Sequence, residues 1–593
     1  MANFSDEFLN SVPESAKREA KGSVGGMQIA AIRGQGSSGK QRKILSILKR
    51  SMAANEQGRT QDAVKLALRA LDVDENSAVA NHVLAVSVEK LGHLSKALSF
   101  YQRAWELDPN DADIYQNLSL VAWKLDMLPA AEKFLRLFLE MKPGNVDGVI
   151  NLSGVLRDIG RFDDAVELLR SALFVHEQDP SLWNALGTVL LEKGQPDQSI
   201  VFYEEALRLN PEFSRGWHNM AYAAGLIGDR KRAILAGRKA LINPASAEDR
   251  ETMRYGLGLG LLSVGDIEEG WQEYAARLHP EYEKCMLFVT DVPQIPVGGE
   301  LLAKTVLLIG EQGLGDEVMF LNACADLERD IGPDGHLKIA VEKRLVSLIS
   351  RSFPKAEVGG HKTANAEGRT FRVVDWKTDT GNNDGWVPIA QLGAMYRSSL
   401  NEFPKTKRFL TPDPMRVEAI TRQLADLPEG PKIGISWKSL LMNVARSKYY
   451  SPFEAWKQVL QVPGAVFVNM QYGECSEEIA EVQDELGVTV HSIDGLDLKD
   501  DLDGVAAACC ALDTMIGPMN ATTNLGAACG ANIWFLTAAE AWPLLGSATN
   551  PWYPSAKVFA TPTTSAWDET MGQVATSLRE QLSAGTAAKS AAA

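Results

Sequence analysis

The chain has 593 residues, of which 45% are hydrophobic and 23% charged, as is typical of folded domains. Its 60 basic and 76 acidic residues give a net charge of −16, which argues against a protein that follows nucleic-acid phosphates. No apolar run reaches the roughly 18 residues that cross a bilayer, and the first residues lack the apolar region of a signal peptide. We therefore expect a cytoplasmic protein of three or four domains, with no nucleic-acid partner and no membrane span.

Residues 1–44 are predicted to be a flexible segment. They contain a run, GQGSSGK, that fits the phosphate-loop pattern G-x-x-x-x-G-K. A working loop needs Ser or Thr next, where this chain has Gln41, and no βαβ unit follows. We interpret the run as a Gly/Ser linker.

A 34-residue period begins near residue 45. The grid positions are Gly58, Gly92, Asp126, Gly160, Gly194 and Gly228. Small residues recur five positions later, at Ala63, Ala97, Ala131, Ala165, Ser199 and Ala233. Such spacing lets paired antiparallel helices approach closely, with glycine ending the first helix of each pair. The pattern resembles the tetratricopeptide (TPR) repeat family, and it predicts an α-solenoid over residues 45–285, closed by an atypical seventh unit, GDIEEGWQEY.

Asparagines recur nine residues before three grid positions. They are Asn117, Asn151 and Asn219, and Asn184 stands beside the equivalent Ala185. Aligned amides along a TPR groove can hold a peptide backbone by donating and accepting hydrogen bonds, which would make the groove the site of a protein partner. The alternative is that asparagine here only suits the turn.

From about residue 286 the pattern changes to α/β. Short apolar runs alternate with helical stretches in two blocks, residues 286–425 and 426–580. In the first block, KTVLLI predicts a buried strand that enters the glycine turn GEQGLGD and then a helix. In the second, PKIGISW, AVFVNMQ, DTMIG and ANIWFL predict strands. Two Rossmann-like halves that face each other at their strand ends form the GT-B architecture.

Five segments in order resemble one family. GEQGLGDEVMFL, IGISWKS, VFVNMQYGE, LDTMIGPMNATTNLGAACGANIWFL and NPWYPSAKVF look like TPR-linked proteins of the heptosyltransferase-like GT-B family. The combination with a TPR arm is most similar to alphaproteobacterial flagellin glycosyltransferases, and more distantly to O-linked N-acetylglucosamine transferases. The resemblance implies transfer of a nonulosonic sugar, such as pseudaminic acid, from a nucleotide donor to Ser or Thr of a protein, with flagellin the expected partner and flagellum assembly the expected setting.

The resemblance also implies a catalytic residue. Asp316 matches the aspartate assigned as general base, which takes the proton of the acceptor hydroxyl. The alternative is a cap for a helix that begins at Glu317. Both roles are compatible with one position.

The donor is expected to contact three groups of residues. They are the glycine turn with Gly313 and Gly315, the basic loop with Lys438, Arg446 and Lys448, and the helix start with Asn520, Thr522, Thr523 and Asn524. At that helix start the family shows Asp-Thr-x-x-x-His, whereas this chain has Met519, Asn520 and Asn524 at the Asp, Thr and His positions. The departure favours a CMP-linked donor over ADP-heptose. It also leaves open a UDP-sugar transferase, or a TPR scaffold with an inactive transferase domain.

No cofactor and no metal are expected. The histidines have no ligand spacing, six cysteines form no C-x-x-C pair, and the Asp501–Asp503 DxD motif opens a helix that it would cap. We assign Trp542, Trp552 and Tyr553 to the core rather than to ligand stacking. The tail over residues 581–593 is predicted to be disordered.

Overall fold

The computed structural model describes residues 39–366, 369–375, 383–439, 450–563 and 566–592, with side chains of the last helix up to residue 584. It divides into two compact units, Met1–Pro211 and Glu212–Ala593. Within the described ranges, no helix is both long and apolar enough to cross a membrane. Residues 1–38 lie outside them, whereas residues 39–44, which we expected to be flexible, form the start of the first helix.

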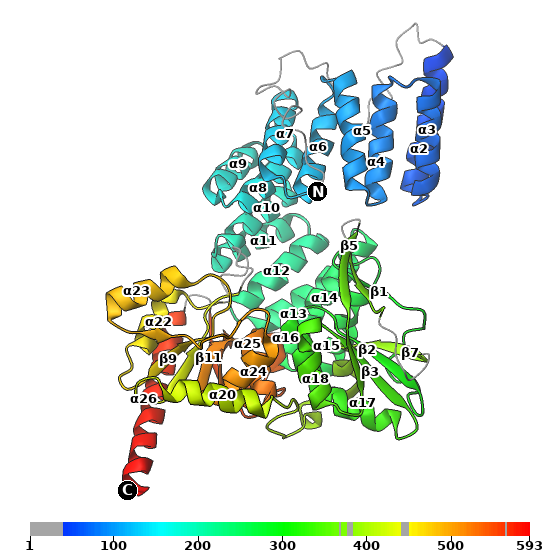
Figure 1. Cartoon of the computed structure of the whole chain (residues 1–593). Helices are drawn as coiled ribbons and strands as arrows, with labels where there is room; N and C mark the ends of the chain where they lie inside the picture. The colour runs from blue at the N-terminus through cyan, green and yellow to red at the C-terminus, as the bar shows by residue number, and fades with distance from the viewer. Residues whose placement is uncertain (1–38, 367–368, 376–382, 440–449, 564–565, 593) are drawn as a thin grey trace. The chain divides into compact units, whose positions relative to one another are not determined.

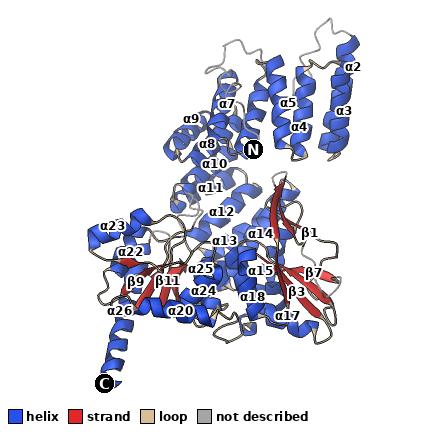
Figure 2. Cartoon of the chain, in the orientation of Figure 1, coloured by secondary structure: helices blue, strands red, loops and turns tan. Residues whose placement is uncertain are grey.

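The first unit is an array of antiparallel helix pairs (Figures 1 and 2). Its helices are α2 (Gly39–Glu56), α3 (Thr60–Val73), α4 (Ala78–Lys90), α5 (Leu94–Leu107), α6 (Ala112–Lys124), α7 (Leu128–Met141), α8 (Val146–Ile159), α9 (Phe162–Val175), α10 (Pro180–Glu192) and α11 (Pro196–Leu209). The recurring alanines are fully buried where helices cross, as at Ala63, Ala97 and Ala131. The predicted solenoid is confirmed here, and small residues explain the close helix approach.

Each turn between paired helices needs a left-handed residue. Gly160 ends α8 with φ 90°, as the period predicts. Asp126 takes the equivalent position after α6 with φ 61°, where a side chain is usually disfavoured. The repeat geometry therefore overrides the residue preference at this one turn.

The second unit begins with helices and continues as α/β. The helices are α12 (Ser214–Leu226), α13 (Arg230–Ala240), α14 (Ala247–Val264), α15 (Ile267–Tyr274) and the 3-10 turn η2 (Ala275–Leu278). Residues 265–274 form the predicted atypical helix pair with α14.

A four-stranded parallel sheet follows, in the order β4-β3-β2-β7. Its strands are β2 (Thr305–Ile309), β3 (His336–Val341), β4 (Glu357–Gly360) and β7 (Gly385–Pro388). The helical segments around it are α16 (Leu314–Phe320), η3 (Leu321–Ala323), α17 (Cys324–Ile331), η4 (Lys343–Leu345), α18 (Val346–Ser352), α19 (Gln391–Tyr396), η5 (Leu400–Glu402) and α20 (Pro414–Ala425). β2 is the strand predicted at residues 304–309, and its apolar run is buried on both faces, as a central parallel strand requires.

The second sheet has six parallel strands, in the order β10-β9-β8-β11-β12-β13. They are β8 (Lys432–Ile435), β9 (Val466–Asn469), β10 (Val490–His491), β11 (Thr514–Pro518), β12 (Ile533–Ala538) and β13 (Lys557–Thr561). Around them lie α22 (Phe453–Leu460), α23 (Ser476–Leu486), α24 (Leu502–Ala511), α25 (Ala521–Ala528), η6 (Trp542–Leu544) and α26 (Trp567–Ala592). The two parallel halves of the α/β prediction are therefore confirmed (Figure 2).

A third sheet was not predicted. β1 (Met286–Val289), β6 (Arg369–Val373) and β5 (Lys362–Ala366) form it, with β1 parallel and β5 antiparallel to β6. β5 is fully exposed and carries the polar sequence KTANA, so no apolar pattern marked it.

One core joins the helical start of the second unit to its α/β part. The Trp271 indole on α15 lies within 6.1 Å of the Phe320 ring and within 6.4 Å of the Trp552 ring, centroid to centroid. Its Nε1 donates to the carbonyl of Arg397 at 2.9 Å. The compact unit therefore begins at Glu212, and the boundary that we expected at 285/286 falls inside it.

The C-terminal end also differs from expectation. We predicted disorder over residues 581–593, but α26 continues to Ala592. The alanine-rich sequence has a high helix propensity, which explains why low complexity does not interrupt the helix.

Candidate functional site

The site is built on the loop between β2 and α16, at the carboxyl end of the first sheet. α16 begins at Leu314 with Gly313 as its N-cap, so the helix starts three residues before the Glu317 that we expected. The carboxylate of Asp316 accepts a hydrogen bond from the Gly313 N–H at 3.2 Å. Asp316 therefore does cap this helix, from inside the first turn.

Asp316 has a shifted pKa. The pKa of its carboxyl is raised to about 6, chiefly by burial and also by the negative charges of Glu311 and Glu317, against the lowering effect of the Gly313 hydrogen bond. A carboxyl group with a pKa near 6 is ionised at neutral pH yet holds a proton more readily than an ordinary aspartate. Such a group suits a general base.

Two flanking contacts hold the loop from the helical side. Arg277 on η2 pairs with Glu311 through Nε to Oε2 at 3.0 Å and Nη2 to Oε1 at 2.9 Å, and both side chains are buried. Gln312 takes the left-handed conformation, with φ 61°, and donates to the Tyr274 hydroxyl at 2.6 Å. A strained backbone of this kind persists where neighbours fix it, and it is common at functional sites.

A second cluster holds the loop from the strand side. Glu317 is 1% exposed and contacts His361 Nε2 through Oε1 at 2.9 Å and the Glu342 N–H through Oε2 at 2.9 Å. Arg372 on β6 donates to the Gln312 carbonyl at 3.0 Å. The buried atoms His361 Nδ1 and Arg372 Nε have no hydrogen-bond partner. Arg277, His361 and Arg372 were missed by sequence reasoning because only tertiary structure brings them to this loop.

In the second half, the N-terminal end of α25 lies next to α16. Asn520 is its N-cap: Oδ1 accepts from the Thr523 N–H at 3.3 Å, and Nδ2 donates to Ser436 Oγ at 3.4 Å. Thr523 is fully buried and its hydroxyl donates to the Pro518 carbonyl at 2.5 Å. Thr522 is 3% exposed. Asn520 and Thr523 therefore stabilise the helix start, and Thr522 is buried beside them.

Asn524 joins the two halves. Its Nδ2 donates to the Gly315 carbonyl at 3.2 Å, and α16 packs against α25 at this point. A Cβ at position 315 would lie 3.0 Å from that Nδ2, so glycine permits the close approach. Asn524 Oδ1 is buried without a partner. The structure thus brings together Gly313, Gly315, Asp316 and Asn524.

The end of β8 carries one of the predicted cations. Lys438 forms an ion pair with Glu478, which occupies its ammonium group. The turn itself is held by Gln471, which is buried and whose Oε1 accepts the N–H groups of Trp437 and Lys438, each at 2.9 Å. Arg446 and Lys448 lie outside the described residues. Gln471 was not recognised from the sequence, although it stands in the VFVNMQYGE segment.

Known proteins resemble this chain in two ways. Residues 48–112 and 154–213 match the tetratricopeptide repeat family. Protein FlbA of Caulobacter vibrioides is 41% identical over 519 residues, which cover 87% of each chain. The chain belongs to the FlbA family. The peroxisomal targeting signal receptor of Saccharomyces cerevisiae is 36% identical over 72 residues, 12% of each chain. The solved structure of Pseudomonas aeruginosa pilF is 18% identical with a TM-score of 0.30, and covers 37% of this chain and 99% of its own.

This member of the FlbA family has a further acidic group at a strand end. Glu540 follows β12, and its Oε1 is buried without a partner. Burial raises the pKa of Glu540 to about 7, against the lowering effect of Arg230. Arg230 also donates to the Ala539 carbonyl at 3.1 Å. Sequence reasoning missed Glu540 because a single Glu after an apolar run is not a motif.

The three asparagines predicted to bind a protein partner differ in their surroundings. Asn117 Nδ2 lies 2.7 Å from His82 Nε2 on the preceding repeat, and His82 Nδ1 lies 3.7 Å from Asp111 Oδ2. Asn151 is half-buried on α8. Asn219 lies on α12 in the second compact unit. Asn117 therefore serves contacts between neighbouring repeats, besides any role in a groove.

Other residues singled out in the sequence of this FlbA-family chain have structural contacts. Asp501 caps α24 by accepting the Gly504 N–H at 3.1 Å, as expected, and Asp503 pairs with Arg351 at 2.6 Å. Trp552 and Tyr553 are buried, which confirms them as core residues. Across the described ranges, no group of three His, Cys, Asp or Glu side chains has the arrangement of a metal site.

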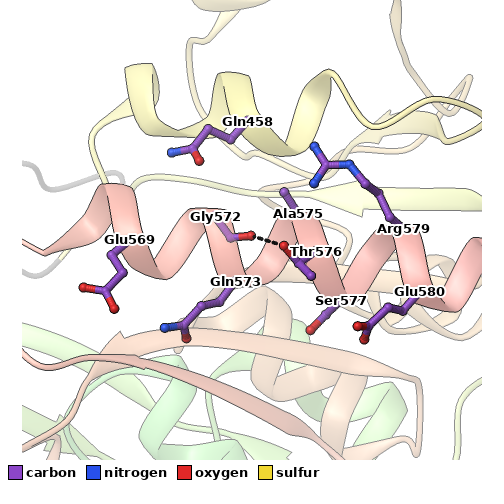
Figure 3. Close-up of a pocket in the computed structure, with 9 residues that line it drawn as sticks. All are labelled: Gln458, Glu569, Gly572, Gln573, Ala575, Thr576, Ser577, Arg579 and Glu580. Atoms are coloured by element: carbon purple, nitrogen blue, oxygen red, sulfur yellow. Dashed lines mark hydrogen bonds between the residues drawn. The ribbon is translucent and has the colours of Figure 1, made fainter.

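The surface cavities of the second unit include two that differ in their linings. One, of about 640 Å³, runs along α26 beside Gln458 and is lined by polar side chains such as Gln573 and Arg579 (Figure 3). The other, of about 270 Å³, lies between α15, η2 and α19, and its walls include Trp271, Tyr274 and Arg277. The second cavity thus reaches the residues that support the Asp316 loop.

Proposed function

We propose that this protein is a metal-independent glycosyltransferase of the GT-B kind. It moves a nonulosonic sugar, such as pseudaminic acid, from a CMP-linked donor to Ser or Thr of a protein bound by the repeats. The observation that carries the proposal is the carboxyl group of Asp316, whose pKa is about 6, at the meeting edge of two parallel α/β halves. Parallel α/β proteins bind their ligands at such carboxyl edges.

The chemistry follows from that position. The acceptor hydroxyl oxygen attacks the anomeric carbon of the donor sugar, the new carbon–oxygen bond forms, and the bond to the CMP phosphate breaks. Asp316 takes the hydroxyl proton, and CMP leaves with the bonding electron pair. The start of α25 presents backbone N–H groups suited to the phosphate. Lys438, Arg446 and Lys448 are the cations proposed to neutralise it.

The partner is proposed to be flagellin, in the cytoplasm. TPR arrays bind protein segments, and the resemblance to flagellin glycosyltransferases, together with a relative named FlbA, points to this acceptor. The asparagines Asn117, Asn151 and Asn219 are proposed contacts, although Asn117 already bonds to His82.

A scaffold without transferase activity is the second candidate. Its support is the absence of the family's acid and imidazole, since Met519 and Asn524 stand at those positions, and the use of Asn524 Nδ2 within the protein. A UDP-sugar transferase is the third candidate, which differs from the main proposal only in the donor.

One experiment separates these candidates. The full chain is incubated with purified flagellin and either a CMP-linked nonulosonate or UDP-N-acetylglucosamine, and the intact mass of flagellin is measured. We expect a mass increase of one or more nonulosonate residues with the CMP donor alone. An increase with only the UDP donor favours the third candidate. Binding of flagellin with no mass change from either donor, together with no CMP release, would favour the scaffold.

A further inference from the structure

The β2–α16 loop has charged or titratable neighbours on the elements packed around it. On the loop and helix themselves are Glu311 and Glu317. From the helical segment come Tyr255 on α14, Tyr274 on α15 and Arg277 on η2, and Tyr553 approaches after β12. His361 and Arg372 contact Glu317 from the strand side, at 2.9 and 3.8 Å. Charges on other elements can therefore alter what Asp316 does.

Among these contacts, the Arg277–Glu311 pair is distinctive in its geometry. Two parallel N–H···O bonds join the guanidinium to the carboxylate, and Glu311 Oε1 also accepts the Ala390 N–H at 3.0 Å. The pair is almost completely buried, with 7% of Arg277 and 2% of Glu311 exposed. Arg277 also lies over the Tyr274 ring, 4.5 Å from its centroid. The pair thus ties η2, the loop and the start of α19 together by direct hydrogen bonds.

We propose that Arg277, together with Glu311, is a positioning pair for the reaction at Asp316. This inference rests on the proposed transferase function. The bidentate pair sets the path of the loop that leads to Gly313 and Asp316, and the Arg277 charge offsets the Glu311 charge beside the Asp316 carboxyl. The last helical turn before β1 is therefore part of the transferase centre, although it precedes the first predicted strand of the α/β domain.

The two single variants have opposite electrostatic consequences. Arg277→Gln leaves Glu311 negative and unopposed, so Asp316 should ionise at higher pH. Glu311→Gln leaves Arg277 positive and unopposed, so Asp316 should ionise at lower pH. Each shift should be about half to one pH unit for an unopposed charge that acts on a partly buried carboxyl. The double variant, Arg277→Gln with Glu311→Gln, removes both charges and should return the ionisation close to that of the wild type.

The test measures transfer to flagellin from a CMP-linked nonulosonate across pH 5 to 8, with kcat and KM for the donor determined separately. We expect the acid limb of kcat to move up in Arg277→Gln, down in Glu311→Gln and back in the double variant. The proposal would be overturned if both single variants had lower activity but kept the acid limb of the wild type. Arg254→Gln is the matched control, because Arg254 pairs with Glu273 at 2.8 Å and with Glu251 at 2.9 Å on the same helical segment. Its acid limb should not move.

A second measurement does not depend on activity. The difference in the free energy of unfolding between each protein and its Asp316→Asn derivative, followed against pH, reports the ionisation of Asp316 directly. If flagellin is not modified by the wild type, the proposed function fails, while this measurement still decides the inference. If Arg277→Gln does not fold, Glu311→Gln and the double variant decide it by the same two readouts.

Discussion

Asp316 caps a helix and is also the residue that we propose as the general base. Its carboxylate closes the first turn of α16 through Gly313, and burial holds its pKa near 6. A capping carboxylate at a helix start usually has a lowered pKa, because the helix N-terminus favours its negative charge. Here desolvation and two buried acids outweigh that effect. The balance is what distinguishes this residue from an ordinary cap.

Asp316→Asn should abolish transfer. The amide keeps the size and can still accept the Gly313 hydrogen bond, but it cannot take a proton from the acceptor hydroxyl. We expect kcat to fall by about 10²- to 10⁴-fold, the usual contribution of a general base. The measurement is CMP release and flagellin mass, with flagellin binding as the control that should remain unchanged. Turnover within a few fold of the wild type would exclude Asp316 as the base.

The same variant should be more stable than the wild type at neutral pH. The folded pKa of about 6 lies above the ordinary 3.8, so the folded state binds the proton more tightly than the unfolded state. The stability contributed by that proton is present below pH 4 and is lost as the pH rises through 6. Above pH 7 the ionised carboxylate costs on the order of 2 kcal/mol, which Asn removes. Denaturant unfolding at pH 5 and pH 8 checks this, and the gain from Asn should be larger at pH 8.

Within the second unit, helix α14 crosses α15 at a short distance. Gly258 packs against the backbone of α15, where an added Cβ would lie 2.5 Å from the Tyr274 nitrogen. Two residues along the same helix, a Cβ at Gly260 would meet nothing within 4 Å. The helix crossing therefore depends on Gly258 on α14, as it also does on Gly270 on α15, where an added Cβ would lie 3.0 Å from the Leu262 nitrogen, and it determines where Trp271, Tyr274 and Arg277 lie.

Gly258→Ala and Gly260→Ala should change stability in opposite directions. Alanine at 258 must push α15 away from α14, because the obstacle is backbone, and we expect a loss of about 1–3 kcal/mol. Alanine at 260 only reduces the flexibility of the unfolded chain, and it should stabilise by about 0.5–1 kcal/mol. Thermal unfolding of both variants provides the comparison. Equal effects at the two positions would contradict the tight crossing.

The boundary between the two compact units does not coincide with the end of the repeat pattern. The 34-residue period continues past residue 211, but the compact units divide there. From Glu212 onward the helices belong to the α/β unit, since Leu262, Trp271 and Tyr274 share one hydrophobic core with Val306 and Phe320. The chain thus uses one repeat type for two purposes, as an array and as part of the α/β unit.

Fragments should follow the compact units rather than the repeat boundary. Residues 212–593 should be soluble and unfold in one cooperative transition. Residues 286–593 should aggregate, because removing α14, α15 and η2 exposes Phe320 and Trp552 and leaves the buried Glu311 carboxylate without Arg277. Size-exclusion chromatography and thermal unfolding of the two fragments test this. A monomeric, cooperative 286–593 fragment would mean that the helical segment is dispensable.

The sequence by itself determined the classes of structure in this protein. The 34-residue period specifies antiparallel helix pairs, because small residues at this fixed spacing let paired helices approach closely. Apolar runs before glycine turns specify buried parallel strands such as β2 and β8. The resemblance of the GEQGLGDE segment to the heptosyltransferase-like family also implied Asp316 as the catalytic residue. These features are local, so a one-dimensional pattern carries them.

Only the tertiary structure decided what surrounds Asp316 and where the units divide. Arg277, His361 and Arg372 reach the loop from segments separated by 34, 44 and 60 residues from their partners Glu311, Glu317 and Gln312. No periodic pattern encodes such pairings. The pKa of Asp316 depends on burial and on the charges that these contacts place beside it, and both are properties of the packed molecule. The buried state of Thr522 and Thr523 has the same origin, since only packing turns a polar helix start into an internal support.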